Sequence, residues 1–94
     1  MPAIAADELR SEVLRVQRAG LIPVLLVVYD EASGAEAGRH MLGCFAVPRA
    51  GEVIRLGGAK VGVFGVSHDF SFTAARGGVR LQVITVAGYA ERPA

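Results

Sequence analysis

IPVLLVVYD, residues 22–30, is the stretch of the sequence that decides the fold. Its Val, Leu and Ile residues favour a β-strand, yet apolar and polar residues do not alternate along it. A strand that is apolar on both faces must be covered on both faces. One cover is the core of the domain, and the other has to be a helix or a second molecule.

A helix that could supply the second cover is predicted directly before this strand, at residues 7–19 (DELRSEVLRVQRA). Its apolar side chains recur at spacings of three and four residues, which places them on one helix face. We expect this face to dock on the sheet through Leu9, Val13 and Val16. Gly20 fits the position just after the last helical turn, where glycine commonly ends a helix.

Four further strands are predicted, at residues 39–47, 52–56, 59–68 and 79–90. The segments 31–38 and 69–78 lack this pattern and are predicted as loops. One helix followed by five short strands predicts a mainly β, α+β fold: a five-stranded antiparallel small barrel or rolled sheet, SH3-like. We expect residues 1–94 to form a single domain, with the helix at 7–19 and the barrel at 22–90.

Glycines mark the turns and irregularities of these strands. Gly57 and Gly58 together indicate a two-residue hairpin. Gly43 favours a bulge, and so do Gly62 and Gly65, which lie where the apolar pattern slips from one strand face to the other. The glycine-rich run lacks the Gly-Lys-Ser/Thr of a phosphate-binding loop, so no cofactor is expected.

Composition and charge argue against several classes of function. The chain is 52% hydrophobic, with a mean hydropathy of +0.42, which is more apolar surface than 94 residues readily hide. Its formal net charge is +1 and it has no basic run, so nucleic acid is not the expected partner. The apolar run 21–29 is too short to cross a membrane. The single cysteine, Cys44, fits a reducing compartment, and we expect a cytoplasmic location.

His68 and Asp69, in VGVFGVSHDFSF (61–72), are the residues that most resemble a polar site. They could form a general base oriented by a carboxylate, or a metal site together with His40 and Cys44. However, adjacent residues in a strand point to opposite faces, and zinc sites use closely spaced ligand pairs that are lacking here. The sequence favours a structural role, and no catalytic, cofactor-binding or metal-binding residue is predicted.

Two patterns in the second half of the chain are Pro48-x-x-Gly51-Glu52-x-Ile54-x-Leu56-x-Gly58 and Val63-x-x-Val66-x-His68-Asp69-Phe70. They resemble patterns in short uncharacterised bacterial and phage-encoded proteins with rolled β-sheets. The resemblance implies a small β-barrel in which the histidine-acid pair closes a strand, and it implies no shared activity. The sequence departs from the pattern at Val61, where an aromatic residue is common.

The favoured function is a non-enzymatic binding or assembly module that self-associates. The first strand has no polar face, and the last strand sets further apolar residues against Val83. These features predict a homo-oligomer, most simply a dimer, and leave room for an unidentified protein partner. The expected interface residues are Val24, Leu25, Leu26, Val27, Val28, Ile84 and Val86. The competing interpretation is a closed barrel whose first strand is capped by the helix, which needs no partner.

The alternative function is a nucleic-acid-binding small barrel. It requires the cations to gather on one face: Arg39, Arg49, Arg55, Lys60, Arg76 and Arg80. The near-zero net charge and the expected absence of a surface aromatic cluster count against it. A small enzyme that uses His68 and Asp69 is the least favoured hypothesis.

Overall fold

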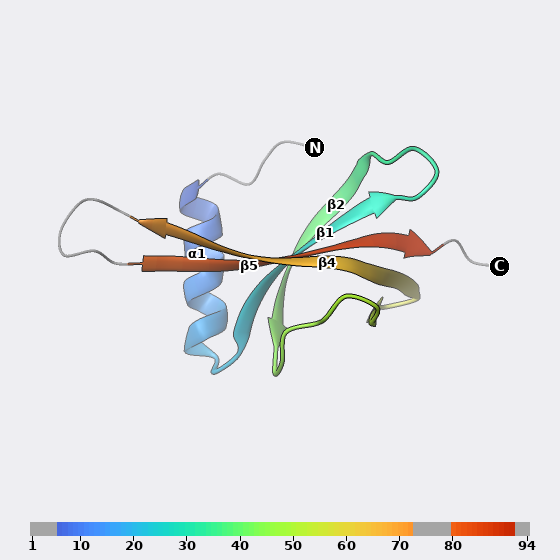
Figure 1. The fold of residues 1–94 in the computed structure, drawn as a ribbon. Coiled ribbons are helices and arrows are strands. Elements are labelled where there is room, and N and C mark those ends of the chain that lie inside the picture. Colours follow the sequence, from blue (N-terminus) through green and yellow to red (C-terminus); the bar gives the residue numbers. More distant parts are fainter. Residues whose placement is uncertain (1–5, 73–79, 92–94) are drawn as a thin grey trace.

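The computed structural model describes residues 6–72 and 80–91, and the side chains of residues 9–68 and 84–91. These residues form α1 (Ala6–Arg18), β1 (Ile22–Asp30), β2 (Glu36–Cys44), β3 (Val53–Leu56), β4 (Ala59–Phe72) and β5 (Arg80–Glu91). The five strands make one sheet that curls into a half-barrel, with α1 against it (Figure 1). The predicted fold class, mainly β with one N-terminal helix, is confirmed.

The strands follow the order β2-β1-β5-β4-β3, and one pairing in it differs from the prediction. The pairs β1–β2, β3–β4 and β4–β5 are antiparallel, as expected. The neighbouring strands β1 and β5 instead run parallel, from Val24 opposite Ile84 to Asp30 opposite Ala90. Parallel neighbours need a long connection, which β2, β3 and β4 together supply.

Strand β1 is buried on both faces, and each face has a cover within the same chain. On the inner face, residues of β1 pack with Val61 and Val63 of β4 and with residues of β5. On the outer face, α1 packs against β1 and β2, where Val13 and Val16 are buried and Leu9 is half-buried. The helix is therefore the second cover that the apolar strand requires.

This arrangement corrects the expected dimer interface. Its seven residues are each at most 8% exposed in the single chain: Val24, Leu25, Leu26, Val27, Val28, Ile84 and Val86. The core and the helix already cover them, so they cannot meet a second molecule without unfolding. The inference that β1 and β5 need an intermolecular cover is wrong.

The end of α1 is fixed by a glycine in the left-handed region. Gly20 has a φ of +79°, its N–H donates to the Gln17 carbonyl at 2.9 Å, and the Leu21 N–H donates to the Val16 carbonyl at 3.2 Å. Leu21 and Val16 then lie over Gly43 of β2, where an added Cβ would be 2.7 Å from Leu21 Cδ1. The predicted bulge at Gly43 is therefore wrong, because Gly43 pairs regularly with Pro23. The glycine instead leaves room for the end of the helix.

Strand β4 carries the bulge that its glycines predict. Its register with β5 shifts between Val63 and Gly65, so Phe64 is the extra residue. The two-residue hairpin at Gly57 and Gly58 is also confirmed, since Leu56 pairs with Ala59. The predicted loop 69–78 is wrong at its start, because β4 continues to Phe72 against β5.

Candidate functional site

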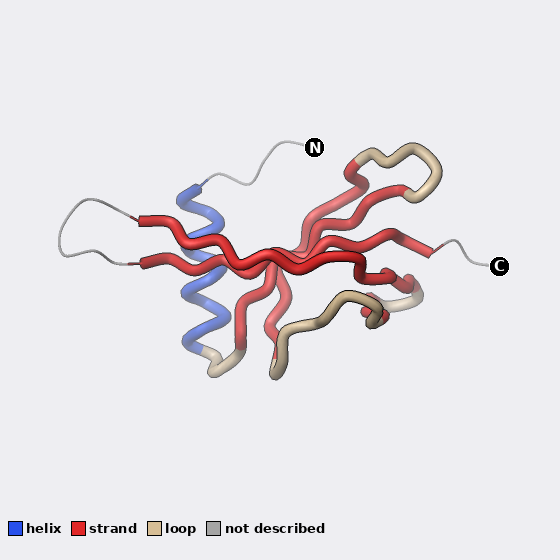
Figure 2. Tube along the Cα trace, viewed as in Figure 1, coloured by secondary structure: helices blue, strands red, loops and turns tan. Residues whose placement is uncertain are grey.

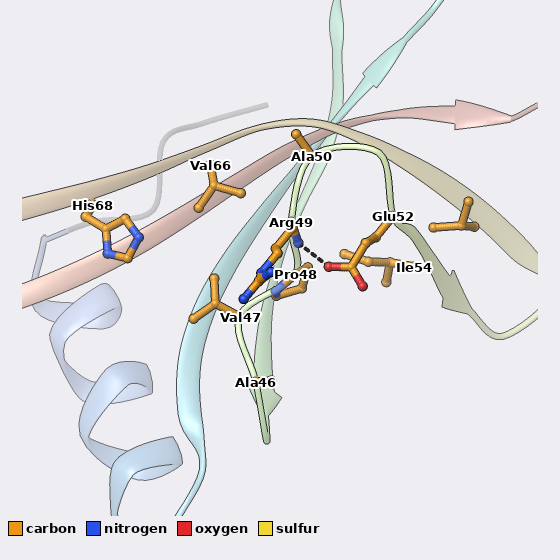
Figure 3. A pocket seen from close by; sticks show the side chains of 10 residues that line it. Ala46, Val47, Pro48, Arg49, Ala50, Glu52, Ile54, Val66 and His68 are labelled. Atoms are coloured by element: carbon orange, nitrogen blue, oxygen red, sulfur yellow. Dashed lines mark hydrogen bonds between the residues drawn. The ribbon is translucent and has the colours of Figure 1, made fainter.

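An open groove of about 970 Å³ lies beside the inner core, between β4 and the connection from β2 to β3 (Figure 3). Val47, Ile54 and Val66 line it and also pack against the core, so this part of the lining is apolar. Arg49, Glu52 and His68 add polar groups. The groove is therefore an extension of the core that solvent can enter, with charged groups along its sides.

The wall of the groove is the connection 45–52, drawn in tan below β4 in Figure 2. The Gly51 N–H donates to the Val63 carbonyl and the Val63 N–H donates to the Glu52 carbonyl, both at 2.9 Å. The Arg49 N–H donates to Glu52 Oε1 at 2.6 Å. These bonds hold the connection against β4, so the groove has a fixed wall.

His68 lines the groove, and its partner in the catalytic pair considered above is the next residue of β4. His68 is exposed, and the residue has an interaction partner within the chain. The Asp69 side chain lies outside the described residues. The backbone of β4 continues as a strand through both residues, and neighbouring residues of a strand do not face the same side. Strand alternation therefore still argues against a general base that Asp69 orients.

The other two residues considered for a metal site lie on β2. Cys44 is half-buried against the core, and burial raises the pKa of its thiol, which disfavours the reactive thiolate. His40 is exposed and pairs with Leu26 across the strands. Over the side chains that the structure describes, no three His, Cys, Asp or Glu residues lie close enough to hold a metal ion.

Phe45 is a functional candidate that the sequence reasoning missed. The sequence placed it inside a strand at 39–47, but β2 ends at Cys44 and Phe45 begins the connection. Its side chain is 94% exposed, the most exposed of the large hydrophobic side chains described. Val53, on the groove, is 51% exposed. A fully solvated ring next to an apolar groove is typical of a contact surface.

The cations of the nucleic-acid hypothesis do not form a single cluster. Arg39, on β2, donates to both carboxylate oxygens of Glu36 and holds the pKa of that carboxyl below its usual value. Arg55 and Lys60 pair on β3 and β4, at the other end of the strand order. Arg49 lines the groove, and the side chains of Arg76 and Arg80 lie outside the described residues.

The expected absence of a surface aromatic cluster is wrong, because three rings meet across three strands. Phe64 contacts Tyr89 with ring centroids 4.7 Å apart and Tyr29 with centroids 5.9 Å apart. Phe64 is 49% and Tyr89 38% exposed. The three residues are far apart in the sequence, and only the sheet order β1-β5-β4 brings them together. We refer to Tyr29, Phe64 and Tyr89 as the aromatic platform.

Searches of protein-family models, curated proteins and solved structures find no match to this chain. The resemblance to short bacterial and phage-encoded proteins therefore stays a prediction. In the part of the chain that the structure covers, no helix has the length and apolar character needed to span a membrane.

Proposed function

We propose that the protein is a non-enzymatic binding module that self-associates through residues 45–54. The observation that carries this proposal is the exposure of Phe45, which is 94% accessible to solvent beside an open groove with an apolar lining. Removing such a ring from water is favourable, since a fully buried Phe side chain contributes about 1.5–3 kcal/mol. A partner that covers Phe45 and enters the groove would gain this contribution.

The proposed partner is a second copy of the chain. Residues 45–54 carry both a projecting ring and the wall of a groove, so the same segment can act as insert and receptor. Under a two-fold axis, Phe45 of each copy enters the groove of the other, which makes the interface self-complementary. The groove volume of about 970 Å³ is ample for one aromatic ring.

Charge on the groove agrees with a two-fold pairing. Arg49 and Glu52 lie close together, and the Glu52 carboxylate accepts a bond from the Arg49 backbone N–H. The Arg49 guanidinium has no carboxylate within ion-pair distance among the described residues. A second copy related by two-fold symmetry brings its own Glu52 toward this cation, which adds electrostatic complementarity to the apolar contact.

Light scattering coupled to size exclusion at low micromolar concentration tests the proposal. We expect the unaltered protein to elute with the mass of a dimer and Phe45→Ser with the mass of a monomer. Phe45→Ser should still unfold cooperatively, because Phe45 contributes little to the core, whereas only the unaltered dimer should gain stability as the protein concentration rises. Arg49→Glu should also weaken the dimer, because it places like charges across the interface.

Leu14→Ser is the matched control, because Leu14 is an exposed apolar residue on α1, away from the groove. This variant should remain dimeric. A monomer mass for the unaltered protein contradicts self-association. A dimer that persists in Phe45→Ser contradicts the use of residues 45–54.

Three finer expectations remain part of this proposal. An SH3-like relationship is supported by the small size and curvature of the sheet. A cytoplasmic location is supported by the single cysteine. A bacterial or phage origin rests on the pattern resemblance between Pro48 and Phe70.

A further inference from the structure

The outer face of the half-barrel is divided into a covered part and an open part. The helix covers the part near the start of β1 and the end of β2, where Val16 and Leu21 lie over Gly43. Tyr29 lies near the opposite end of β1 and is paired with Tyr89 of β5. The aromatic platform therefore occupies the part of this face that α1 leaves open.

The bulge in β4 brings Phe64 to this face. Val61 and Val63 are buried in the inner core, so Lys60 and Gly62 point outward by strand alternation. Gly62 pairs with Tyr89, and Phe64 follows at the bulge with its ring against Tyr89. The result is a cluster of three tilted rings in which the half-exposed Phe64 contacts both tyrosines.

Two cations border the platform on the β3 side. Lys60 is two residues from Gly62, about 7 Å along β4. Arg55 pairs directly with Lys60, and both side chains are exposed. Glu91 of β5 faces Lys60 from the other side, and its Oε1 would lie 3.7 Å from a Cβ added to Gly62. Neither cation forms an ion pair with a described carboxylate, so Lys60, Arg55 and Glu91 together leave one net positive charge beside the rings for a phosphate.

We propose that this face binds single-stranded nucleic acid. Bases stack on the aromatic platform, and the phosphates of the same strand lie against Lys60 and Arg55. Stacked rings beside a pair of cations are the combination that sequence-tolerant single-strand binding uses. A duplex does not fit, because its bases are already stacked on one another and cannot reach the rings. The inference does not depend on the proposed self-association, which uses the groove rather than this face.

The tyrosines offer a direct probe of this binding. The chain has no Trp and two Tyr, and both Tyr belong to the platform. Intrinsic fluorescence therefore reports on the platform alone, and stacked bases should quench it. We would titrate the full chain with oligothymidylate of about 15 nucleotides, a length within the site sizes of small barrels. Quenching that saturates at low salt is the expected result.

Affinity should depend on salt and on the named residues. Two phosphate contacts predict a slope of about −1.4 in log affinity against log salt concentration. Phe64→Ala should weaken binding by about tenfold or more, since one stacked base contributes about that much. Lys60→Glu should also weaken binding, by removing a phosphate contact and adding a negative charge, and it should lower the salt dependence. Lys60 is fully outside the core, so Lys60→Glu remains informative if Phe64→Ala proves unstable.

Arg10→Glu is the matched control, because it makes the same charge change on an exposed residue of α1. Its affinity should stay within about twofold of the unaltered protein, as expected for a cation that contacts no phosphate. Phe45→Ser should bind oligothymidylate with the affinity of the unaltered protein, whether the variant is a monomer or a dimer. This variant separates the outer-face proposal from the groove proposal.

Three results would overturn the inference. The first is no quenching or binding of oligothymidylate or oligouridylate at low salt. The second is an equal loss of affinity in Lys60→Glu and Arg10→Glu, which would show that binding depends on the net charge of the protein and not on this face. The third is equal affinity for duplex and single strand. Saturable quenching by a proline-rich peptide without any by oligothymidylate would also refute it, because the platform would then be a peptide site.

Discussion

At the scale of single residues, the closeness of β4 and β5 depends on one glycine. Gly88 is buried on β5, and a Cβ at this position would overlap Val61 Cγ1 and lie 2.9 Å from the Gly62 carbonyl oxygen. Gly65 on β4 differs, since nothing lies within 4 Å of an added Cβ there. The two glycines look alike in the sequence, and only the packing distinguishes them.

We expect Gly88→Ala to lower the free energy of unfolding by about 1–3 kcal/mol, the usual cost of an added methyl group in a packed core. The clash involves backbone atoms of β4, which cannot move aside as a flexible side chain would. Urea unfolding followed by circular dichroism measures the difference. Gly65→Ala serves as the control and should unfold close to the unaltered protein. Similar losses in both variants would show that the cost is one of strand glycines in general.

At the scale of elements, the packing of α1 on β1 decides how the outer apolar face of the sheet is covered. The sequence correctly indicates a strand with two apolar faces and a helix with one apolar stripe. It does not tell whether the helix alone covers the outer face of β1. In the structure Val13 is 0% and Val16 4% exposed, while Leu14 on the neighbouring helix face is 38% exposed.

Val13→Ala should therefore destabilise the protein by about 2 kcal/mol, because it removes buried methyl groups and leaves a cavity between helix and sheet. Leu14→Ala, at the neighbouring position, removes one carbon more than Val13→Ala, yet its effect should be within about 0.5 kcal/mol because Leu14 is exposed. Thermal and urea unfolding of the two variants provide the measurement. Equal effects would mean that α1 does not dock through the Val13 face.

The elements that the sequence predicts well are those set by local signals. The hairpin at Gly57 and the helix end at Gly20 follow from glycines that take a positive φ, and the bulge at Phe64 follows from a slip in the apolar pattern. The parallel pairing of β1 with β5 has no local signal, because it joins residues far apart in the chain. The extension of β4 to Phe72 depends in the same way on its partner strand.

The candidate surfaces were harder to predict for the same reason. Phe45 is exposed only because β2 ends one residue earlier, and a boundary of this kind is not readable from composition. The aromatic platform depends on the strand order, which sets Tyr29 beside Tyr89. By contrast, the sequence argument against a catalytic His68 and Asp69 pair used strand alternation, a local property.

At the scale of the whole molecule, the sheet has a doubly paired centre and singly paired ends. Residues 24–28 of β1 lie between β2 and β5. Residues 69–72 of β4 and 80–83 of β5 pair with each other, and the described strands place no other neighbour beside them. Cooperative stability should therefore be concentrated in β1 and the second half of β5.

Native-state hydrogen exchange should reveal this difference. We expect the amides of residues 24–28 to exchange only through global unfolding, because they are paired and buried on both faces. The paired amides of residues 69–72 and 80–83 should exchange at least about tenfold faster, through local opening. Exchange followed by mass spectrometry or NMR gives the comparison. Uniform protection along β4 and β5 would contradict this view of the sheet.

The parallel pairing of β1 and β5 also has a consequence for how the chain is made. Strand β1 is synthesised early, but its neighbour β5 emerges from the ribosome only after β2, β3 and β4. Contacts between distant segments form slowly, and an uncovered apolar strand is prone to aggregate while it waits. Helix α1 precedes β1, so it can cover the outer face of the nascent strand at once. The position of α1 before β1 thus protects one face of β1 in the nascent chain until β5 has been synthesised.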